Sequence, residues 1–237
     1  MGGEAILPLR RSILLCALLG VLVLGGLWLR QHLSSGQPSE AAGPTIDKQP
    51  VNFVNRTFDP ANPPSDMPPL AYGEYGECDS HFLSNASVGG QTRQIDAMHA
   101  TLTVTRVKVT LQLNITIWLP AQSAQHVIEH EDGHRQISEY YYQTADKVAE
   151  RIAASYMGKQ IDIAGEDQAA ESSKALQEIA KEITDEYNKE LNPEPTQLLY
   201  DSITNHGVND TVAKDAAAYA IRNVVIDSPQ PPAAPGN

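Results

Sequence analysis

Residues 98 to 134 read MHATLTVTRVKVTLQLNITIWLPAQSAQHVIEHEDGH, and this stretch decides the fold. Apolar and polar residues alternate from Met98 to Val104, the parity changes at Thr105 and Arg106, and the alternation then resumes as far as Ile117. A period of two over this length predicts β-structure with one buried and one solvated face. The change of parity leaves two forms open, either two strands or one strand with a bulge.

A long helix is expected directly after this strand. Residues 121 to 157 contain no Pro and only one Gly, Gly133, so we predict a single helix that bends, if anywhere, at Gly133. Its apolar residues recur in steps of three and four and define a buried stripe. The stripe consists of Val127, Ile137, Tyr141, Ala145, Val148, Ile152 and Tyr156. His130 and His134 fill the gap in this stripe and are expected to be buried.

Three further helices are predicted towards the C-terminus. The first covers residues 168 to 191 and has a mixed Glu/Lys outer face, the second covers 196 to 203, and the last covers 210 to 224. The sequence Asn-His-Gly at 205 to 207 marks a turn between the second and the last.

The N-terminal region predicts a membrane anchor. Residues 13 to 29 form a run of 17 residues without a charge, preceded by Arg10 and Arg11. The two arginines favour an N-terminus inside the cell and a domain outside it, and a cleaved signal peptide is the alternative. We therefore divide the chain into an anchor at 1 to 33, a Pro/Ser-rich linker at 34 to 69, a folded domain at 70 to 226 and a disordered tail at 227 to 237.

The charge of the chain argues against nucleic acid as a partner. The formal net charge is −12, and no dense cluster of Lys and Arg follows residue 34. A phosphate-binding surface needs such a cluster.

Residues 130 to 134 read His-Glu-Asp-Gly-His and carry the predicted chemistry. Two histidines four residues apart lie on one face of a helix, so their imidazoles can occupy two corners of one tetrahedral zinc ion. Glu131 lies beside them, where its carboxylate can accept a proton from a zinc-bound water. We therefore predict zinc as the cofactor, with His130 and His134 as ligands and Glu131 as the catalytic base.

Three segments together resemble a known family. They are VKVTLQLNITIWLP at 107 to 120, HEDGHRQIS at 130 to 138 and YDSITNHG at 200 to 207. Over residues 70 to 210 the chain is similar to an exported bacterial family that is catalogued as a domain of unknown function and described as zinc-dependent proteases. The resemblance implies a zincin-like α+β fold, in which an antiparallel sheet packs on the HExxH helix and C-terminal helices follow. It also implies a zinc site and a place in the Gram-negative envelope, but no particular substrate.

The motif leaves the third zinc ligand open. The metzincin pattern is excluded, because it needs Gly and His where the chain has Ile137 and Tyr140. Glu171, Glu178 and Glu182 of the helix at 168 to 191 are possible ligands, but their spacing places them on its solvated face.

His206 is the third ligand that we favour. It follows a short helix and precedes Gly207 at a turn, and Asp201 and Thr204 lie close enough in sequence to orient an imidazole by hydrogen bonds. Asp201 is expected to orient this histidine or to replace it as a ligand. Tyr200 is a candidate to stabilise the oxyanion of the reaction.

These observations predict a zinc-dependent peptidase of the cell envelope, anchored in the inner membrane with its domain in the periplasm and acting on peptide or protein substrates. The alternative is a non-catalytic binding module that zinc stabilises. No cysteine lies near the motif, which excludes a closed thiolate site, and a structural site would leave Glu131 unexplained. Both facts favour the enzyme.

Overall fold

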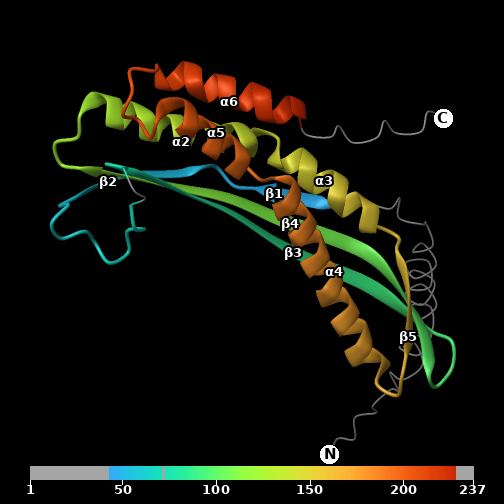
Figure 1. The fold of residues 1–237 in the computed structure, drawn as a ribbon. Coiled ribbons are helices and arrows are strands. Elements are labelled where there is room, and N and C mark those ends of the chain that lie inside the picture. The colour runs from blue at the N-terminus through green and yellow to red at the C-terminus, as the bar shows by residue number, and fades with distance from the viewer. Residues whose placement is uncertain (1–42, 71–72, 228–237) are drawn as a thin grey trace, which may run out of the picture. The chain divides into compact units, whose positions relative to one another are not determined.

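The computed structural model describes residues 43–70 and 73–227 (Figure 1). The predicted anchor, the beginning of the predicted linker and the tail from residue 228 lie outside the described residues. Within the described ranges, none of the helices has an apolar run long enough to cross a bilayer. The described residues belong to a unit that begins at Gly43.

One long strand organises the sheet. This strand, β4 (His99–Pro120), pairs along one edge with β3 (Glu77–Gln94), which runs antiparallel to it. Its other partners are β1 (Thr45–Lys48) and β2 (Asn52–Phe58), both parallel to it, and β5 (Gln160–Ala164), which is antiparallel. The protein is therefore an α+β protein whose sheet is built around a single central strand.

The change of parity in the sequence is a β-bulge within β4. Gly89 of β3 pairs with Arg106, whereas the next residue, Gly90, pairs with Val104, so Thr105 is the extra residue. Apolar side chains on both sides of the bulge are buried on the same face of the sheet. The prediction of one bulged strand, the second of the two forms considered, is thus confirmed.

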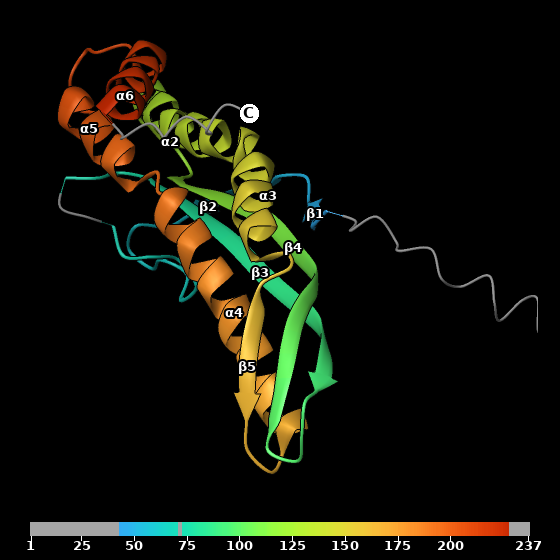
Figure 2. The same cartoon turned by 90° about the vertical axis from the view of Figure 1, so that its right-hand side faces the viewer.

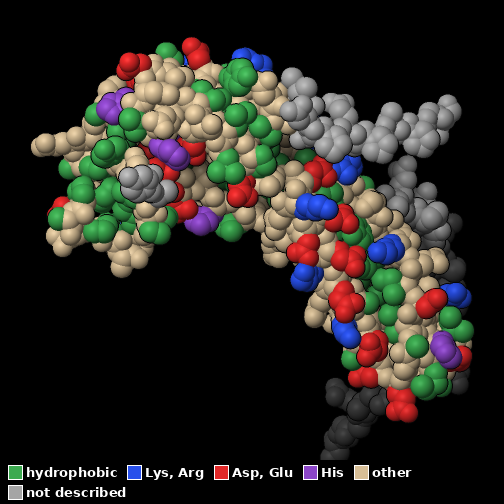
Figure 3. Space-filling view, viewed as in Figure 1, with side chains coloured by type: hydrophobic (Ala, Val, Ile, Leu, Met, Phe, Trp, Pro, Cys, Tyr) green, Lys and Arg blue, Asp and Glu red, His purple; other side chains and the backbone are tan. Residues whose placement is uncertain are grey.

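All five helices of the described chain gather on one face of the sheet (Figures 1 and 2). They are α2 (Gln125–Gln143), α3 (Ala145–Tyr156), α4 (Gln168–Glu190), α5 (Glu194–Thr204) and α6 (Ala213–Asp227). The predicted helices at 168 to 191, 196 to 203 and 210 to 224 are confirmed as α4, α5 and α6. Acidic and basic side chains mix along the outer face of α4 (Figure 3).

Two apolar cores hold these helices in place. Alternate side chains of β4 from Val107 to Ile115 pack against α3 and α4. A second core joins α2, α5 and α6 through Ile137, Tyr200 and several alanines of α6. The first half of α2 therefore lies between the sheet and the α5–α6 pair, and this arrangement positions the functional residues.

The prediction of one helix from 121 to 157 is wrong. The helix breaks at Thr144, whose φ of −101° and ψ of 3° separate α2 from α3, and not at Gly133. Just before the break, Tyr142 is buried and its hydroxyl donates a hydrogen bond to the backbone oxygen of Gln49. α2 contacts the sheet on one side and α5 and α6 on the other. Tyr142 packs on the sheet side, whereas Tyr141 packs against the core that α2 forms with α5 and α6.

The prediction of a linker from 34 to 69 is wrong for the residues that form β1 and β2. The prediction of an antiparallel sheet is also wrong for these two strands, because both run parallel to β4. Six of the seven residues of β2 are exposed, so no alternation of burial marks this strand in the sequence. β1 has only four residues, too few to show a period.

Candidate metal centre

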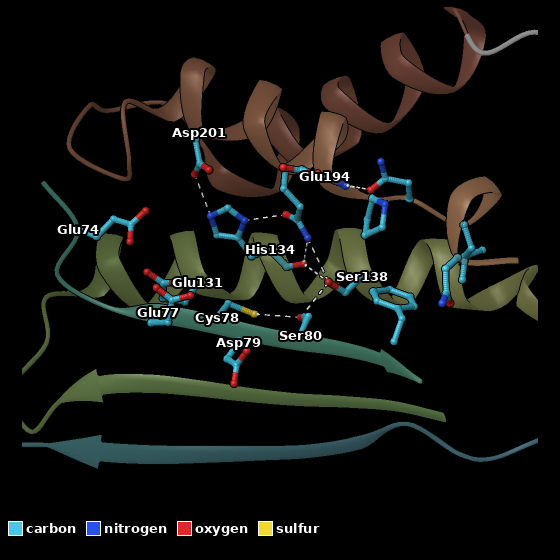
Figure 4. A pocket seen from close by; sticks show the side chains of 16 residues that line it. Glu74, Glu77, Cys78, Asp79, Ser80, Glu131, His134, Ser138, Glu194 and Asp201 are labelled. Atoms are coloured by element: carbon cyan, nitrogen blue, oxygen red, sulfur yellow. Dashed lines mark hydrogen bonds and ion pairs between the residues drawn. The ribbon is translucent and has the colours of Figure 1, made fainter. Parts of the chain in front are cut away.

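Two helices bring the candidate site together. His130, Glu131 and His134 lie on α2, and Asp201 lies on α5, which packs across α2 with the help of α6 (Figure 4). The Ser138 hydroxyl of α2 also donates a hydrogen bond to Ser80 of β3 at 3.0 Å, which ties the helix to the sheet beside the site.

His130, His134 and Asp201 form a group that can hold a metal ion. The two Nε2 atoms of the histidines lie 3.2 Å apart. Asp201 Oδ1 lies 2.9 Å from Nε2 of His134 and 3.4 Å from Nε2 of His130. Tetrahedral bonds of about 2.0–2.1 Å place neighbouring ligand atoms roughly 3.4 Å apart, so the three atoms match the spacing of a zinc site closely.

The tautomer of His134 favours the binding of a cation between His134 and Asp201. His134 Nδ1 lies 2.7 Å from Gln197 Oε1, and because an amide oxygen can only accept, Nδ1 carries the proton. In the neutral ring, Nε2 then presents a lone pair to Asp201 Oδ1, which lies 2.9 Å away. Acceptors that face one another repel, and a cation between them removes the repulsion.

The two histidines have opposite pKa shifts. Burial and the neighbouring His134 lower the pKa of His130 to about 4. Burial also acts to lower the pKa of His134, but the hydrogen bond and the charge of Asp201 outweigh it, so the pKa of His134 is raised. Without metal and near neutral pH, His130 is therefore neutral, and an additional proton is held more readily by His134.

Glu131 is a buried carboxylate with no partner. Glu131 is 3% exposed, and no hydrogen bond or ion pair joins its side chain to another described residue. Burial raises its pKa to about 8, and the charge of nearby Glu77 adds to the effect. Gly76 lies so close that a Cβ atom there would stand 2.9 Å from Glu131 Oε1. The backbone just before β3 thus encloses the side chain that the sequence assigned as the base.

Two glycines allow the close packing of the centre. A Cβ atom at Gly133 would lie 2.1 Å from the Tyr200 hydroxyl, so α2 and α5 approach each other only because residue 133 has no side chain. A Cβ atom at Gly207 would lie 2.9 Å from Cβ and Cγ of His130, and its φ of +72° also favours glycine. These two contacts hold α2 against Tyr200 of α5 and against the turn at Gly207 that follows α5.

The proposed oxyanion role of Tyr200 does not fit its contacts. The side chain is fully buried, stacks on the His130 ring at 5.1 Å between centroids and donates a hydrogen bond to the backbone oxygen of His130. A hydroxyl engaged with the backbone cannot also face a substrate. Tyr200 therefore holds α5 against α2.

The structure places Asp201, and not His206, in the group that can hold a metal. Nδ1 of His206 lies 4.0 Å from Asp201 Oδ1 and 3.5 Å from Glu74 Oε1, and its side chain is 40% exposed. His206 adopts a left-handed φ of 54°, which is uncommon for a residue with a side chain. It therefore lies beside the group and does not line the cleft. Glu171, Glu178 and Glu182 are exposed on α4 and do not belong to the group.

Sequence reasoning missed Gln197, which orients His134. Besides its bond to Nδ1, its side-chain amide donates to the backbone oxygen of His134 at 3.2 Å and to the Ser138 hydroxyl at 3.1 Å. Gln197 and Asp201 are four residues apart on α5, so they share one face of that helix. A Gln and an Asp four residues apart, just after Pro195, are the signal in the sequence for this part of the site.

A cleft of about 500 Å³ opens beside the centre. α2, α5, the start of β3 and the end of α4 line it, and Glu131, His134 and Asp201 face into it (Figure 4). Six of its described lining residues are acidic and none is Lys or Arg. They are Glu74, Glu77, Asp79, Glu131, Glu194 and Asp201. Figure 3 shows histidine and acidic side chains close together on this part of the surface.

No family model matches the chain, and no curated protein and no solved structure matches it with significance. The resemblance to the exported family of zinc-dependent proteases therefore rests on the quoted motif residues alone.

Proposed function

We propose that this chain is a zinc metallopeptidase. The observation that carries the proposal is the position of Glu131, a buried carboxylate without a partner that faces an open cleft beside three metal-binding atoms. Burial of an unpaired acid lowers stability, so its retention at this position is best explained by chemistry.

The ligand set supports a catalytic and not a structural site. Among the described residues the group has three members, His130, His134 and Asp201. Structural zinc sites have four protein ligands, whereas catalytic sites have three and leave one position to water or substrate. Two of the three members, His134 and Asp201, line the cleft, so a substrate in the cleft would lie beside them.

A zinc ion held by these ligands would lower the pKa of a coordinated water and polarise the scissile carbonyl. Glu131 accepts a proton from the attacking water on a carboxylate oxygen and passes it to the nitrogen of the leaving amine. Burial raises the pKa of Glu131 to about 8 without metal, and the positive charge of a zinc ion beside it would lower that pKa and favour the carboxylate that accepts the proton. Gln197 fixes the His134 ring through its Nδ1 proton.

His206 supports the site from outside the cleft. Its Nδ1 atom is buried and lies 3.5 Å from Glu74 Oε1 and 4.0 Å from Asp201 Oδ1. From this position it can help to hold both carboxylates in place.

We also propose that the apolar run at residues 13 to 29 anchors the domain on the outer side of the inner membrane, in the periplasm. The proposal rests on Arg10 and Arg11, which precede the run. A periplasm-dependent reporter fused after Asn237 should be active, and a cytoplasm-dependent one inactive. The opposite pattern would exclude this topology.

The zinc content of four variants of the full chain tests the site. The wild type should bind one zinc ion per chain, and Glu131→Gln should keep that ion and lose hydrolysis of a denatured protein substrate. Asp201→Asn should lower zinc affinity as strongly as His134→Ala. His206→Ala should keep zinc and lower only the rate. Zinc binding that depends on His206 and not on Asp201 would reverse the assignment, and a fully active Glu131→Gln variant would exclude the peptidase mechanism.

A further inference from the structure

A second hollow lies among the helices, and none of its lining residues belongs to the metal-binding group. It is a groove of about 430 Å³ between α2, α3, α6 and the turn that joins α4 to α5. Its apolar lining consists of Tyr140, Tyr141, Val148, Leu191, Pro195 and Val224. Leu191 and Asn192 also line the cleft beside the metal centre, so this turn forms a wall of both hollows.

Two tyrosines form the aromatic wall of the groove. The rings of Tyr140 and Tyr141 lie 5.9 Å apart between centroids, with their planes at 80°. The Tyr141 hydroxyl shares a hydrogen bond of 2.6 Å with the Thr196 hydroxyl, which holds this ring in place. Tyr140 is 40% exposed, and its hydroxyl has no hydrogen-bond partner among the described residues. The groove therefore combines a fixed ring with a second ring whose hydroxyl is available to an occupant.

This lining has the chemistry of a binding site for proline-rich segments. Such segments form the polyproline II helix, which has no internal hydrogen bonds, so its carbonyl groups accept hydrogen bonds from a partner. Their backbone is already restricted before binding, and grooves lined by aromatic residues recognise them for this reason. A tyrosine suits this task because its ring packs on a proline ring while its hydroxyl donates to a carbonyl.

The chain carries a proline-rich segment directly after α6. Residues 228 to 237 read SPQPPAAPGN and include four prolines. They follow Asp227, the last residue of α6, which lies three residues or about 5 Å beyond the groove residue Val224. Because residue 228 precedes a proline, its sequence disfavours continuation of the helix. Ten residues of polyproline II span about 31 Å, which is far more than the distance back to the groove.

We propose that residues 228–237 dock in this groove as a polyproline II segment, with proline rings against Tyr140 and a backbone carbonyl that accepts a hydrogen bond from its hydroxyl. The proposal is independent of the peptidase function. The short tether gives an effective concentration on the order of 1 mM, so even a weak interaction between segment and groove keeps the groove occupied. The docked segment ties the end of α6 to the α4–α5 turn, which is also a wall of the cleft.

Photo-crosslinking of the full chain tests the docking. A benzophenone amino acid replaces Ala234, the protein is illuminated at low concentration, and mass spectrometry identifies the crosslinked peptides. We expect crosslinks within one chain to residues 140–148 and 189–195, which contain most of the groove lining. A mixture of isotopically light and heavy protein distinguishes these products from crosslinks between two chains.

Two variants remove the interaction from its two sides. Tyr140→Ala and the double variant Pro231→Ser/Pro232→Ser should each lower the yield of groove crosslinks at least about 10-fold, as expected for the loss of an aromatic anchor or of its partner. The double variant keeps the label and leaves residues 43–227 unchanged, so it also shows whether the benzophenone itself causes the binding. Tyr219→Ala is the matched control, because Tyr219 is 50% exposed on α6 and does not line the groove. Its yield should equal that of the wild type.

Three results would overturn the proposal. The first is a yield of crosslinks in the groove that is no higher than elsewhere on the surface. The second is a groove yield that either Tyr140→Ala or the double proline variant leaves unchanged. The third is a set of groove crosslinks that occur only between chains, which would assign the groove to the segment of a second copy.

Discussion

Gly133→Ala should damage both the stability and the zinc site, although alanine is the better helix former. The new Cβ atom would lie 2.1 Å from the Tyr200 hydroxyl, about 1.3 Å short of the 3.4 Å at which ordinary contact begins. Tyr200 is fully buried between His130 and the α5–α6 core, so it can yield only if α5 moves away from α2. Asp201 is the next residue on α5 and would move with it.

The expected loss in the free energy of unfolding has three contributions. Overpacking of a core costs about 1–3 kcal/mol. Loss of the hydrogen bond to the backbone oxygen of His130 leaves the buried Tyr200 hydroxyl without an acceptor, which costs another 1–3 kcal/mol or so. Helix propensity returns about 1 kcal/mol. The net destabilisation is about 1–5 kcal/mol, which lowers Tm by roughly 2–20 °C in a domain of this size.

Thermal unfolding in the presence of a chelator measures this effect without the contribution of bound metal. Zinc titration of the same variant should show an affinity at least about 10-fold lower, because metal–ligand distances tolerate shifts of only about 0.2 Å. Gly43→Ala is the control, since its Cβ would meet nothing within 4 Å. If Gly133→Ala matches Gly43→Ala in Tm, the close approach of α2 and α5 has been misjudged.

Three further predictions concern the support of the centre. Gln197→Leu should keep the fold, as judged by circular dichroism, and weaken zinc binding roughly 10 to 100-fold, because Nδ1 of His134 loses its acceptor; unchanged affinity would contradict this role. Tyr200→Phe should lower the free energy of unfolding by about 1–2 kcal/mol and leave peptide hydrolysis intact, whereas lost hydrolysis at normal stability would return Tyr200 to the oxyanion role. Removal of zinc should abolish hydrolysis, and addition of zinc should restore it. Removal should also lower the free energy of unfolding by about 3 kcal/mol, compared with the protein at a free zinc concentration 100-fold above Kd. Hydrolysis that persists in chelator would exclude the metal mechanism.

The long-period patterns of the sequence predicted the main elements well. The alternation around Thr105 gave both the length of β4 and its bulge, and the apolar stripe of α4 gave its limits within a residue or so. Both elements bury one regular face, and burial is what imposes the period. The edge strands lack this constraint. β2 is mostly exposed, and β3 is rich in Ser, Gly and Asn, so neither shows the pattern.

The candidate site also has a part that the sequence predicts and a part that it does not. His130, Glu131 and His134 lie within one turn of one helix, so their spacing alone places them together. The third position depends on how α5 packs against α2, which the sequence does not encode locally. His206 was favoured for its residue type, yet the left-handed turn at Asn205 and His206 carries it to the side of the group. Asp201, considered only as an alternative, faces both imidazoles.

The central place of β4 has a consequence for the synthesis of the chain. Every other strand of the described sheet pairs with β4 and with no other strand. As the chain leaves the ribosome from its N-terminus, β1, β2 and β3 emerge before their common partner, and the last pairing residue on β4, which pairs with β2, is Pro120. During that interval these segments are open to pairing with other chains, and a translational pause before the end of β4 should therefore increase aggregation more than a pause after it.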